Sequence, residues 1–408
     1  MTDVILTVNA GSSSIKFAAY EIGAGALRAV ARGHIDDIGD DTTFEAGPAG
    51  GPAEMQPIDA PRGTVDHGAA LLLAIDWLRQ HEQGFQVVAI GHRVVHGGPD
   101  YAEPVVIDAD TLQRLRQFVP LAPLHQPHNL AGVAAALQAF PDAAQVACFD
   151  TAFHRQHPFI ADTFGLPRRL YDEGVRRYGF HGLSYEYVSR RLRSVAPDLA
   201  SGRVIIAHLG NGASVCALRD GRSIASTMGF TALDGLPMGT RCGQLDPGVV
   251  LYLLTEKGMS ADEITHMLYH DSGLRGLSGL SNDMRELEAS DAPEAREAID
   301  YFVARVRREI AGLAATIGGV DAIVFAGGIG EHAWHVREQI LGDMAWLGIA
   351  LDREANAGNA QTVSQPGSRV TVLVIPTDED RMIAEHTAEI LGLMQAPADS
   401  MMLTRLTA

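Results

Sequence analysis

Short apolar stretches that run into polar, glycine-containing loops recur along the chain. Residues 4–8 lead into Asn9-Ala10-Gly11, and a second β-rich stretch follows at 15–20. Roughly half a chain later, residues 205–209 lead into Gly210-Asn211-Gly212 before another β-rich stretch. Apolar stretches of this length next to glycine turns are typical of strands joined by tight loops. The hydrophobic pattern therefore predicts a strand, a loop and a strand in each half of the chain.

Two further strand-to-glycine elements strengthen this repeat, one at residues 89–93 and one at residues 323–330. Apolar spacing and alanine-rich segments predict helices near 66–81, 130–140, 260–269, 292–317 and 381–391, with another that opens at Gly327 and runs to Arg337. Residues 273–285 are expected to form a loop. A repeated α/β unit of this kind predicts two lobes that face a central cleft.

Composition and charge narrow the class of protein. The 408 residues are 46% hydrophobic and 20% charged, which is typical of a globular protein with two or more domains. The net charge of −18 disfavours nucleic acid and anionic membranes as partners. Three widely spaced cysteines, Cys148, Cys216 and Cys242, predict neither a disulfide framework nor a zinc site. With an acidic start and no long apolar segment, we expect a cytoplasmic protein without a signal peptide or membrane span.

The Gly210-Asn211-Gly212 turn is the first candidate for chemistry. Both glycines can adopt positive φ and, without a Cβ atom, allow a phosphate oxygen to approach the main chain. An ordinary β-hairpin explains the same residues. However, His181 and Arg241 flank the turn in glycine-rich segments without regular periodicity, and segments of that kind commonly build binding sites.

Arg93, Asp150 and His181 are candidates that each have a structural alternative. Arg93 follows a strand and stands between two histidines among glycines, a pattern that fits either an anion site or a structural loop. Asp150 ends a short strand, where α/β proteins place ligands, although capping of the next segment explains it equally well. His181 by itself also fits a structural histidine beside Phe180.

Six short motifs together resemble the acetate kinase family. They are Val8-Asn9-Ala10-Gly11-Ser12-Ser13-Ser14-Ile15-Lys16, Gly91-His92-Arg93-Val94-Val95-His96-Gly97-Gly98, Tyr178-Gly179-Phe180-His181-Gly182, His208-Leu209-Gly210-Asn211-Gly212, Met238-Gly239-Thr240-Arg241 and Gly328-Ile329-Gly330-Glu331. Each motif is weak alone, but they follow the family's order across nearly the whole chain.

The resemblance implies a fold and a domain arrangement. The fold is a duplicated ribonuclease-H-like, or actin-like ATPase, α/β architecture with two lobes around a central nucleotide cleft. Residues 1–150 and 383–408 would form the N-terminal lobe, closed by the C-terminal helix. Residues 151–382 would form the C-terminal, nucleotide-binding lobe.

The resemblance also assigns roles to individual residues. Asn9 and Glu379 would hold Mg²⁺, or Mn²⁺ as an alternative. Arg93 and Arg241 would bind the carboxylate or acyl phosphate, His181 would stabilise the transferring phosphoryl group, and Asp150 matches the active-site aspartate. The small acyl pocket would consist of Arg93, Val95, Leu124, Phe180 and Ala232. Contacts to ATP or ADP would come from Lys16, His208, Leu209, Gly210, Asn211, Gly212, Asp283, Met284, Arg285, Gly328, Ile329, Gly330, Glu331 and His332.

Several positions depart from the family pattern. Ala232 replaces a proline of the acyl pocket, and the lost bulk would admit a longer acid. The other departures are Cys242, Gln244, His332, Asp378 and Asp380, which bear on substrate and nucleotide preference and remove no proposed catalytic group.

The implied reaction is reversible, Mg²⁺-dependent phosphoryl transfer from ATP to acetate, giving acetyl phosphate and ADP by in-line displacement in a homodimer. Such a transfer needs alignment and charge neutralisation. A carboxylate substrate is already ionised at neutral pH, so no general base is needed and we expect Asp150 to orient an arginine or a metal-bound water. The alternatives are a propionate kinase of the same family, less readily a butyrate kinase, and an actin- or chaperone-like nucleotide switch.

Overall fold

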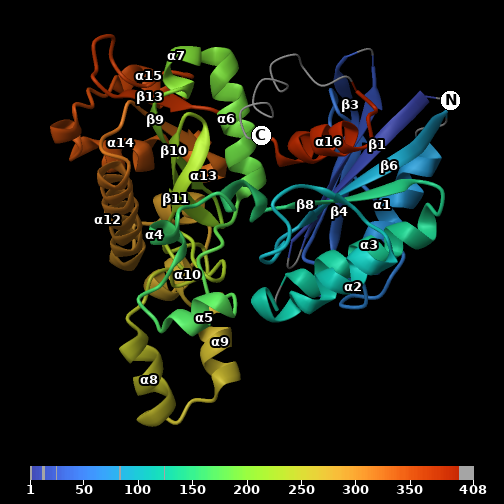
Figure 1. Ribbon diagram of the computed structural model, residues 1–408, viewed down its shortest axis with the longest axis horizontal. Coiled ribbons are helices and arrows are strands. Elements are labelled where there is room, and N and C mark those ends of the chain that lie inside the picture. Colours follow the sequence, from blue (N-terminus) through green and yellow to red (C-terminus); the bar gives the residue numbers. More distant parts are fainter. Residues whose placement is uncertain (1, 12–13, 24, 82–83, 124, 395–408) are drawn as a thin grey trace. The chain divides into compact units, whose positions relative to one another are not determined.

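The computed structural model describes residues 2–11, 14–23, 25–81, 84–123 and 125–394 (Figure 1). The chain forms two compact units. Unit 1 comprises Met1–Ala152 and the chain from Asp378 onward, and unit 2 comprises Phe153–Thr377. The lobes expected from the sequence change over at residues 150 and 382 instead. No helix in the described part of the chain is long and apolar enough to cross a membrane.

Unit 1 is built on an eight-stranded sheet with the order β5-β4-β3-β2-β1-β6-β8-β7. β1 pairs antiparallel with β2 and parallel with β6, and β6 pairs parallel with β8. The strands are β1 (Thr2–Ala10), β2 (Ile15–Ile22), β3 (Leu27–Asp36), β4 (Thr43–Pro48), β5 (Glu54–Met55), β6 (Phe85–Val94), β7 (Val105–Val106) and β8 (Ala144–Phe149).

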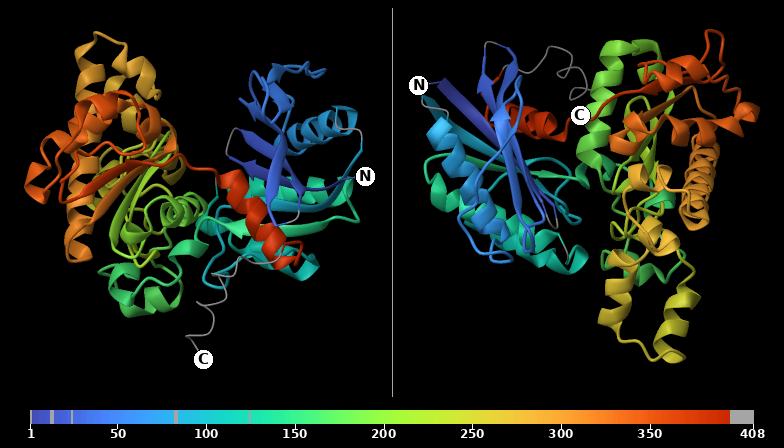
Figure 2. Two further views of the ribbon diagram at one scale, coloured as in Figure 1. Left: turned by 90° about the horizontal axis from the view of Figure 1, so that it is seen from above. Right: turned by 180° about the vertical axis from the view of Figure 1, so that it is seen from behind.

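Helices cover both faces of this sheet, because successive strand residues point to opposite sides. Leu6 packs in a core cluster with Leu71 of α1, whereas Ile5 packs in another with Ala384 and Ala388 of α16. α1 and α3 therefore lie on one face and α16 on the other (Figures 1 and 2). The helices of unit 1 are α1 (His67–His81), α2 (Ala109–Gln117), α3 (Gln126–Ala139) and α16 (Glu379–Ile390), with a 3₁₀ turn at Val119–Leu121.

Unit 2 repeats the central topology of unit 1. Its five-stranded sheet has the order β11-β10-β9-β12-β13, which matches β3-β2-β1-β6-β8 in both order and direction. The duplication predicted from the sequence is therefore confirmed. The strands are β9 (Arg203–Leu209), β10 (Ala213–Arg219), β11 (Arg222–Ser226), β12 (Ala322–Ala326) and β13 (Thr371–Val374).

The second sheet is also covered on both faces. Tyr185 and Val188 of α6 pack on one face, and α12 packs on β9 and β10 from the other (Figures 1 and 2). The helices are α4 (Phe159–Asp162), α5 (Arg168–Asp172), α6 (Gly182–Val195), α7 (Pro197–Ala200), α8 (Pro247–Thr255), α9 (Ala261–His270), α10 (Gly273–Ser278), α11 (Met284–Glu288), α12 (Pro293–Thr316), α13 (Gly327–His332), α14 (Trp334–Gly342) and α15 (Arg353–Ala357), with 3₁₀ turns at Ala152–His154 and Ala345–Leu347.

Two local predictions in unit 2 are wrong. The segment expected to be a loop from residue 273 contains the short helix α10. The helix expected to run from Gly327 to Arg337 is interrupted at Ala333, which separates α13 from α14. Both errors arise in short segments, where tertiary packing outweighs the local pattern.

Candidate active site

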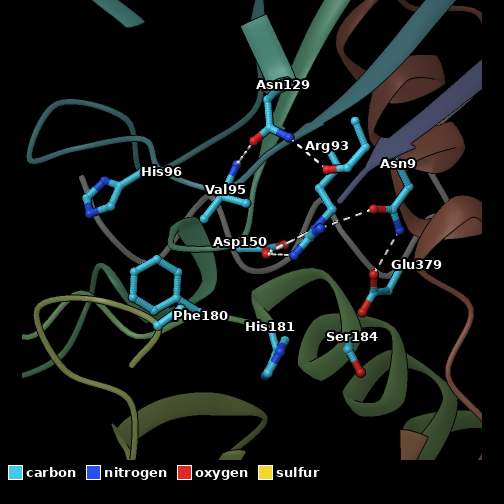
Figure 3. A network of polar contacts seen from close by, with 12 residues as sticks. Asn9, Arg93, Val95, His96, Asn129, Asp150, Phe180, His181, Ser184 and Glu379 are labelled. Atoms are coloured by element: carbon cyan, nitrogen blue, oxygen red, sulfur yellow. Dashed lines mark hydrogen bonds and ion pairs between the residues drawn. The ribbon is translucent and has the colours of Figure 1, made fainter. Parts of the chain in front are cut away.

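Unit 1 holds a chain of polar contacts around Arg93, at the carboxyl ends of β1, β6 and β8 (Figure 3). Arg93 donates from Nε and Nη2 to Oδ2 of Asp150, at 3.0 Å and 2.6 Å. Its Nη1 donates to Oδ1 of Asn9 at 3.2 Å. Nδ2 of Asn9 in turn donates to Oε2 of Glu379 at 3.1 Å. The structure thus brings four of the predicted site residues into one hydrogen-bonded chain.

The Arg93–Asp150 pair is largely shielded from solvent: the Asp150 side chain is 1% exposed and the Arg93 side chain is 16% exposed. Burial opposes the positive charge, but the carboxylates of Asp150 and Glu379 outweigh it and raise the pKa of Arg93. Burial also raises the pKa of Asp150, and the guanidinium opposes that shift. Because two-point hydrogen bonding favours the charged form of both partners, Arg93 is held as an oriented cation.

Strand register explains why these side chains meet. Val94 of β6 lies opposite Phe149 of β8, and the N–H of Asp150 donates to the C=O of Val94 at 3.3 Å. Asp150 therefore continues the parallel ladder by one residue. Its carboxylate pairs with Arg93, and its part in a reaction stays a prediction.

Lys16 and the start of α16 lie beside this network. Lys16 is opposite Asn9 in the β1–β2 hairpin, and its charge acts on Asp380. Burial raises the pKa of Asp380 to about 7, and the charges of Glu379 and Asp378 add to the shift. Oδ1 of Asp380 is buried without a hydrogen-bond partner among the described residues. Negative charge is therefore concentrated next to Asn9.

Asn129 is a site residue that sequence reasoning missed. It lies on α3, is 2% exposed, and accepts the N–H of Val95 at 2.9 Å through Oδ1. Its Nδ2 donates to the C=O of Ala10 at 2.7 Å. One amide thus ties the segment after Arg93 to the segment after Asn9 (Figure 3). No local signal marks it, because both partners are distant in sequence.

In unit 2, His181 lies beside the β9–β10 hairpin in an unusual conformation. It precedes α6 with φ 57° and ψ 25°, in the left-handed region. Its Nδ1 is 2.8 Å from Oγ of Ser214 in β10, and its ring stacks on His208 with centroids 4.5 Å apart. Oγ of Ser184 lies 2.8 Å from Nδ1 of His208. Non-glycine residues held in this region are enriched at functional sites.

The glycines of the Gly210-Asn211-Gly212 turn lack the positive φ that the sequence allowed, and their approach to a phosphate stays a prediction. Neither Gly210 nor Gly212 adopts positive φ. Instead, a Cβ atom at Gly212 would lie 3.0 Å from Nε2 of His181. Gly327, at the start of α13, does adopt positive φ (76°). A Cβ atom there would lie 2.7 Å from the C=O oxygen of Leu209. These glycines therefore allow His181 and the start of α13 to approach the hairpin.

Arg241 is linked to the same turn through the main chain. The N–H of Gly239 donates to the C=O of Asn211 at 3.0 Å. Nη1 of Arg241 donates to the C=O of Ala232 at 3.1 Å. The segment that carries Arg241 therefore depends on both the turn and the Ala232 main chain.

Several residues predicted to contact the nucleotide also make structural contacts within unit 2. Met284 is only 3% exposed and belongs to the core. Asp283 caps α11 and forms an ion pair with Arg285 at 2.5 Å. Glu331 accepts the N–H of Gly327 at 2.8 Å, so this first N–H of α13 is already paired.

Residues 328–332 all lie in α13, close to the hairpin. A Cβ atom at Gly210 would be 3.9 Å from the nitrogen of Gly328. Glu331 and the largely exposed His332 line a pocket of about 230 Å³ together with Asn359. The acyl pocket stays a prediction: Val95 lies in unit 1, Phe180 and Ala232 lie in unit 2, and Leu124 is outside the described residues.

Comparisons with known proteins give a consistent result. A family model described as the Acetokinase family matches residues 4–385. The chain is 56% identical over 407 residues to a Methylocella silvestris protein named acetate kinase, and the match covers 97% of this chain and 100% of that protein.

Two solved structures are similar to the whole fold. An acetate kinase from Porphyromonas gingivalis is 36% identical with a TM-score of 0.85, covering 95% of this chain and 100% of that chain. A propionate kinase from Francisella tularensis is 36% identical with a TM-score of 0.87, covering 95% and 99%. These similarities confirm the predicted actin-like ATPase fold.

Proposed function

The chain belongs to the acetokinase family, and we propose that it catalyses the reversible transfer of a phosphoryl group from ATP to acetate, giving acetyl phosphate and ADP. The observation that carries the proposal is the buried Arg93, held as a cation by Asp150 and Asn9. A fixed guanidinium with a carboxylate behind it is suited to binding a small carboxylate or an acyl phosphate.

Arg93 retains donors for a substrate. Its hydrogen bonds to described residues use the Nε hydrogen and one hydrogen each on Nη1 and Nη2. A guanidinium has five N–H groups, so one more remains on each Nη. Each of them can donate to an oxygen of a carboxylate or a phosphate. Asp150 then acts by orienting Arg93, and the ionised substrate needs no general base.

In unit 2, His181 and Arg241 are proposed to neutralise charge on the transferring phosphoryl group. Phosphoryl transfer depends mainly on alignment and on stabilising the charge of the three equatorial oxygens. Ser214 and His208 hold the His181 ring, and Ala232 holds the guanidinium of Arg241. Rigidly held donors are effective because they need no reorganisation during the reaction.

Asn9 and Glu379 fit an Mg²⁺ ion that arrives with ATP, with Mn²⁺ as the alternative. No cluster of three or more His, Cys, Asp or Glu side chains suited to a metal occurs in the described residues. Mg²⁺ at nucleotide sites commonly takes one or two carboxylates together with phosphate oxygens and water, so a smaller set suffices. The unpartnered Oδ1 of Asp380 and the raised pKa of that residue indicate a place where positive charge is favourable. Bound Mg²⁺ would neutralise phosphate charge.

Propionate kinase activity is a second candidate because of Ala232. Its small side chain replaces a proline of the implied acyl pocket, and the C=O of Ala232 holds Arg241. A methylene in an apolar pocket changes specificity by roughly 10-fold to 200-fold.

Turnover of Mg²⁺-ATP with acetate, propionate and butyrate, with hydroxylamine to trap the acyl phosphate, tests these alternatives. We expect acetate to have the highest kcat/KM. Preference for propionate would assign the second function, and Ala232→Pro should then shift preference back to acetate. ATP hydrolysis without an acid-dependent product would overturn the proposal in favour of a nucleotide switch.

The proposal extends to a homodimer in the cytoplasm. None of the residues of α8 is buried, and Leu251 and Tyr252 are 60% and 49% exposed. An exposed apolar helix face of this kind commonly marks a protein interface. We expect a dimer by sedimentation and a monomer for Leu251→Glu. Leu72→Glu, at a 45% exposed position on α1, is the control that should leave the mass unchanged.

A further inference from the structure

The ring of His181 is joined to two buried hydroxyl groups. Nδ1 of His181 lies 2.8 Å from Oγ of Ser214, and that oxygen lies 2.5 Å from the hydroxyl of Tyr185. Ser214 and Tyr185 are both 0% exposed. Neither hydroxyl was singled out by the sequence, and the roles assigned above do not account for Tyr185.

The direction of these hydrogen bonds follows from the donors available. Among the described residues, the Tyr185 hydroxyl hydrogen-bonds to Ser214. If Ser214 donated to Tyr185, the phenolic hydrogen would be buried without an acceptor, which is unfavourable. If Tyr185 donates to Ser214, the serine hydrogen is free to point to Nδ1 of His181. The second arrangement gives both hydroxyl hydrogens an acceptor.

Burial keeps Tyr185 in the donor form. Burial and the neighbouring Cys216 raise the pKa of Tyr185 well above its ordinary value. The phenol therefore stays protonated throughout the pH range in which the protein would work. With Nδ1 of His181 accepting from Ser214, the proton of a neutral imidazole resides on Nε2.

Nε2 is the ring nitrogen near the glycine turn. A Cβ atom at Gly212 would lie only 3.0 Å from it. Two features fix the position of the ring. His208 stacks on it, and the left-handed backbone of His181 sets the direction in which the side chain leaves the main chain. The hydroxyl pair thus controls which atom of a fixed ring carries a hydrogen.

The fold creates this arrangement from two elements. Tyr185 of α6 lies four residues after His181, the residue before the helix, and its N–H donates to the C=O of His181 at 3.0 Å. Ser214 lies opposite His208 in the β9–β10 ladder. The Tyr185 ring packs in the apolar cluster with Val188 and Leu192, which leaves its hydroxyl as the polar tip of a core side chain.

We propose that Tyr185 and Ser214 are positioning residues that set the tautomer of His181, so that Nε2–H is presented as a hydrogen-bond donor. The role of that donor in turnover rests on the proposed kinase function: Nε2–H would donate to an oxygen of the transferring phosphoryl group. The relay itself moves no proton during the reaction. It selects one of two neutral forms of the imidazole.

Tyr185→Phe tests the relay because it deletes one oxygen atom and keeps the ring in the core. Nitrogen-15 NMR of the ligand-free protein, with the His181 signals assigned from His181→Gln, reports the tautomer directly. We expect acceptor-type Nδ1 and protonated Nε2 in the wild type, and a mixture of tautomers in Tyr185→Phe. We expect kcat to fall about fivefold to tenfold, as for one lost hydrogen bond, with KM values within about twofold.

Tyr178→Phe is the matched control. Tyr178 is 1% exposed and its hydroxyl donates to the C=O of Gly174 at 2.9 Å, so the variant also deletes a buried phenolic hydroxyl in unit 2. It should lose comparable stability and keep the wild-type His181 tautomer. If Tyr185→Phe fails to fold, Ser214→Ala carries the same NMR expectation.

Two results would overturn the relay: protonated Nδ1 in the wild type, or a wild-type tautomer in both Tyr185→Phe and Ser214→Ala. Failure of the kinase proposal is recognised separately. It would appear as wild-type protein with the expected tautomer and no acid-dependent turnover.

Discussion

The two units share a strand order, but unit 1 holds its candidate residues with an ion pair and unit 2 holds them with hydrogen bonds between imidazole rings and hydroxyl groups. In unit 1, the ends of β1, β6 and β8 carry a chain of charged groups centred on the buried Arg93–Asp150 pair. In unit 2, the β9–β10 hairpin lies beside histidine rings that contact serine hydroxyls, at His181–Ser214 and His208–Ser184. The same topology thus supports a charged network in one unit and imidazole–hydroxyl pairs in the other.

The difference shows how each unit meets the cost of burial. A buried charge is tolerated only when it is paired, and Asp150 supplies the partner in unit 1. A buried histidine avoids the cost by remaining neutral. Unit 2 contains a clear case beside the site: His154 and His157 share the hydroxyl of Ser223 at 2.8 Å and 2.6 Å. We therefore expect unit 1 to be sensitive to charge removal and unit 2 to acid.

Arg93→Ala should have the largest effect. It leaves the carboxylate of Asp150 buried without its partner, which costs about 3–5 kcal/mol of unfolding free energy. It also removes the proposed substrate donor, so kcat/KM for acetate should fall by about 10²–10³ or more. Urea unfolding and acyl-phosphate trapping measure the two effects.

Arg203→Ala is the matched control for this change. Arg203 also forms a two-point pair with a carboxylate, at 2.6 Å from Asp321, but both side chains are more than a third exposed. Solvent screening makes such pairs weak, so stability should change far less and turnover should not change. Equal losses in the two variants would contradict the importance of burial in unit 1.

Asp150→Asn should have the next largest effect. The amide keeps one oxygen for Arg93 but loses the negative charge that holds the guanidinium, so we expect kcat/KM for acetate to fall by about 10-fold to 100-fold. The pH–rate profile near neutrality should keep its shape, because the carboxylate substrate needs no general base. Loss of an acidic limb from the profile would instead assign Asp150 as a base.

Acid should destabilise unit 2 through His154 and His157. Burial lowers the pKa of His154 to about 4, and burial with the charge of neighbours lowers the pKa of His157 to about 3. The unfolded chain binds these protons first, near its ordinary pKa of about 6.5. Stability is therefore complete above about pH 6.5 and falls as the pH drops toward 4, by roughly 1.4 kcal/mol per pH unit for each histidine.

His157→Gln isolates one of these contributions. Glutamine keeps an N–H donor for Ser223 but does not titrate, so the stability loss between pH 6.5 and 4 should be smaller by roughly 1.4 kcal/mol per pH unit. Unit 1 has a counterpart in His92, whose pKa burial lowers to about 4. An unchanged pH slope in His157→Gln would show that His157 is protonated in the folded protein.

Gly212→Ala should have the smallest effect. The added Cβ atom would lie 3.0 Å from Nε2 of His181, so the ring must move by a few tenths of an ångström. We expect kcat to fall by about 10-fold or less, since small misplacements of a catalytic group are costly. Gly132→Ala on α3 is the control: its Cβ atom would meet nothing within 4 Å, and the variant should be slightly more stable with unchanged kcat.

Sequence alone predicted the repeated α/β pattern and the segments that hold the candidate residues. Apolar stretches next to glycine loops are local signals that predicted the hairpins at Gly11 and Gly210, and helical apolar spacing predicted the long helix α12. Arg93 and Asp150 could be selected because each follows a strand, and parallel strands end at a common edge.

Which side chains contact one another depends on the tertiary fold. Asn129 binds Val95 and Ala10 across 34 and 119 residues, and Ser214 meets His181 across 33. Such contacts depend on strand register and helix packing, which no short window of sequence contains. Gly212 likewise does not adopt positive φ. A glycine suits this position because a Cβ atom would crowd the ring of His181. Local sequence sets backbone preference, whereas side-chain partners and steric limits are set by what the fold brings alongside.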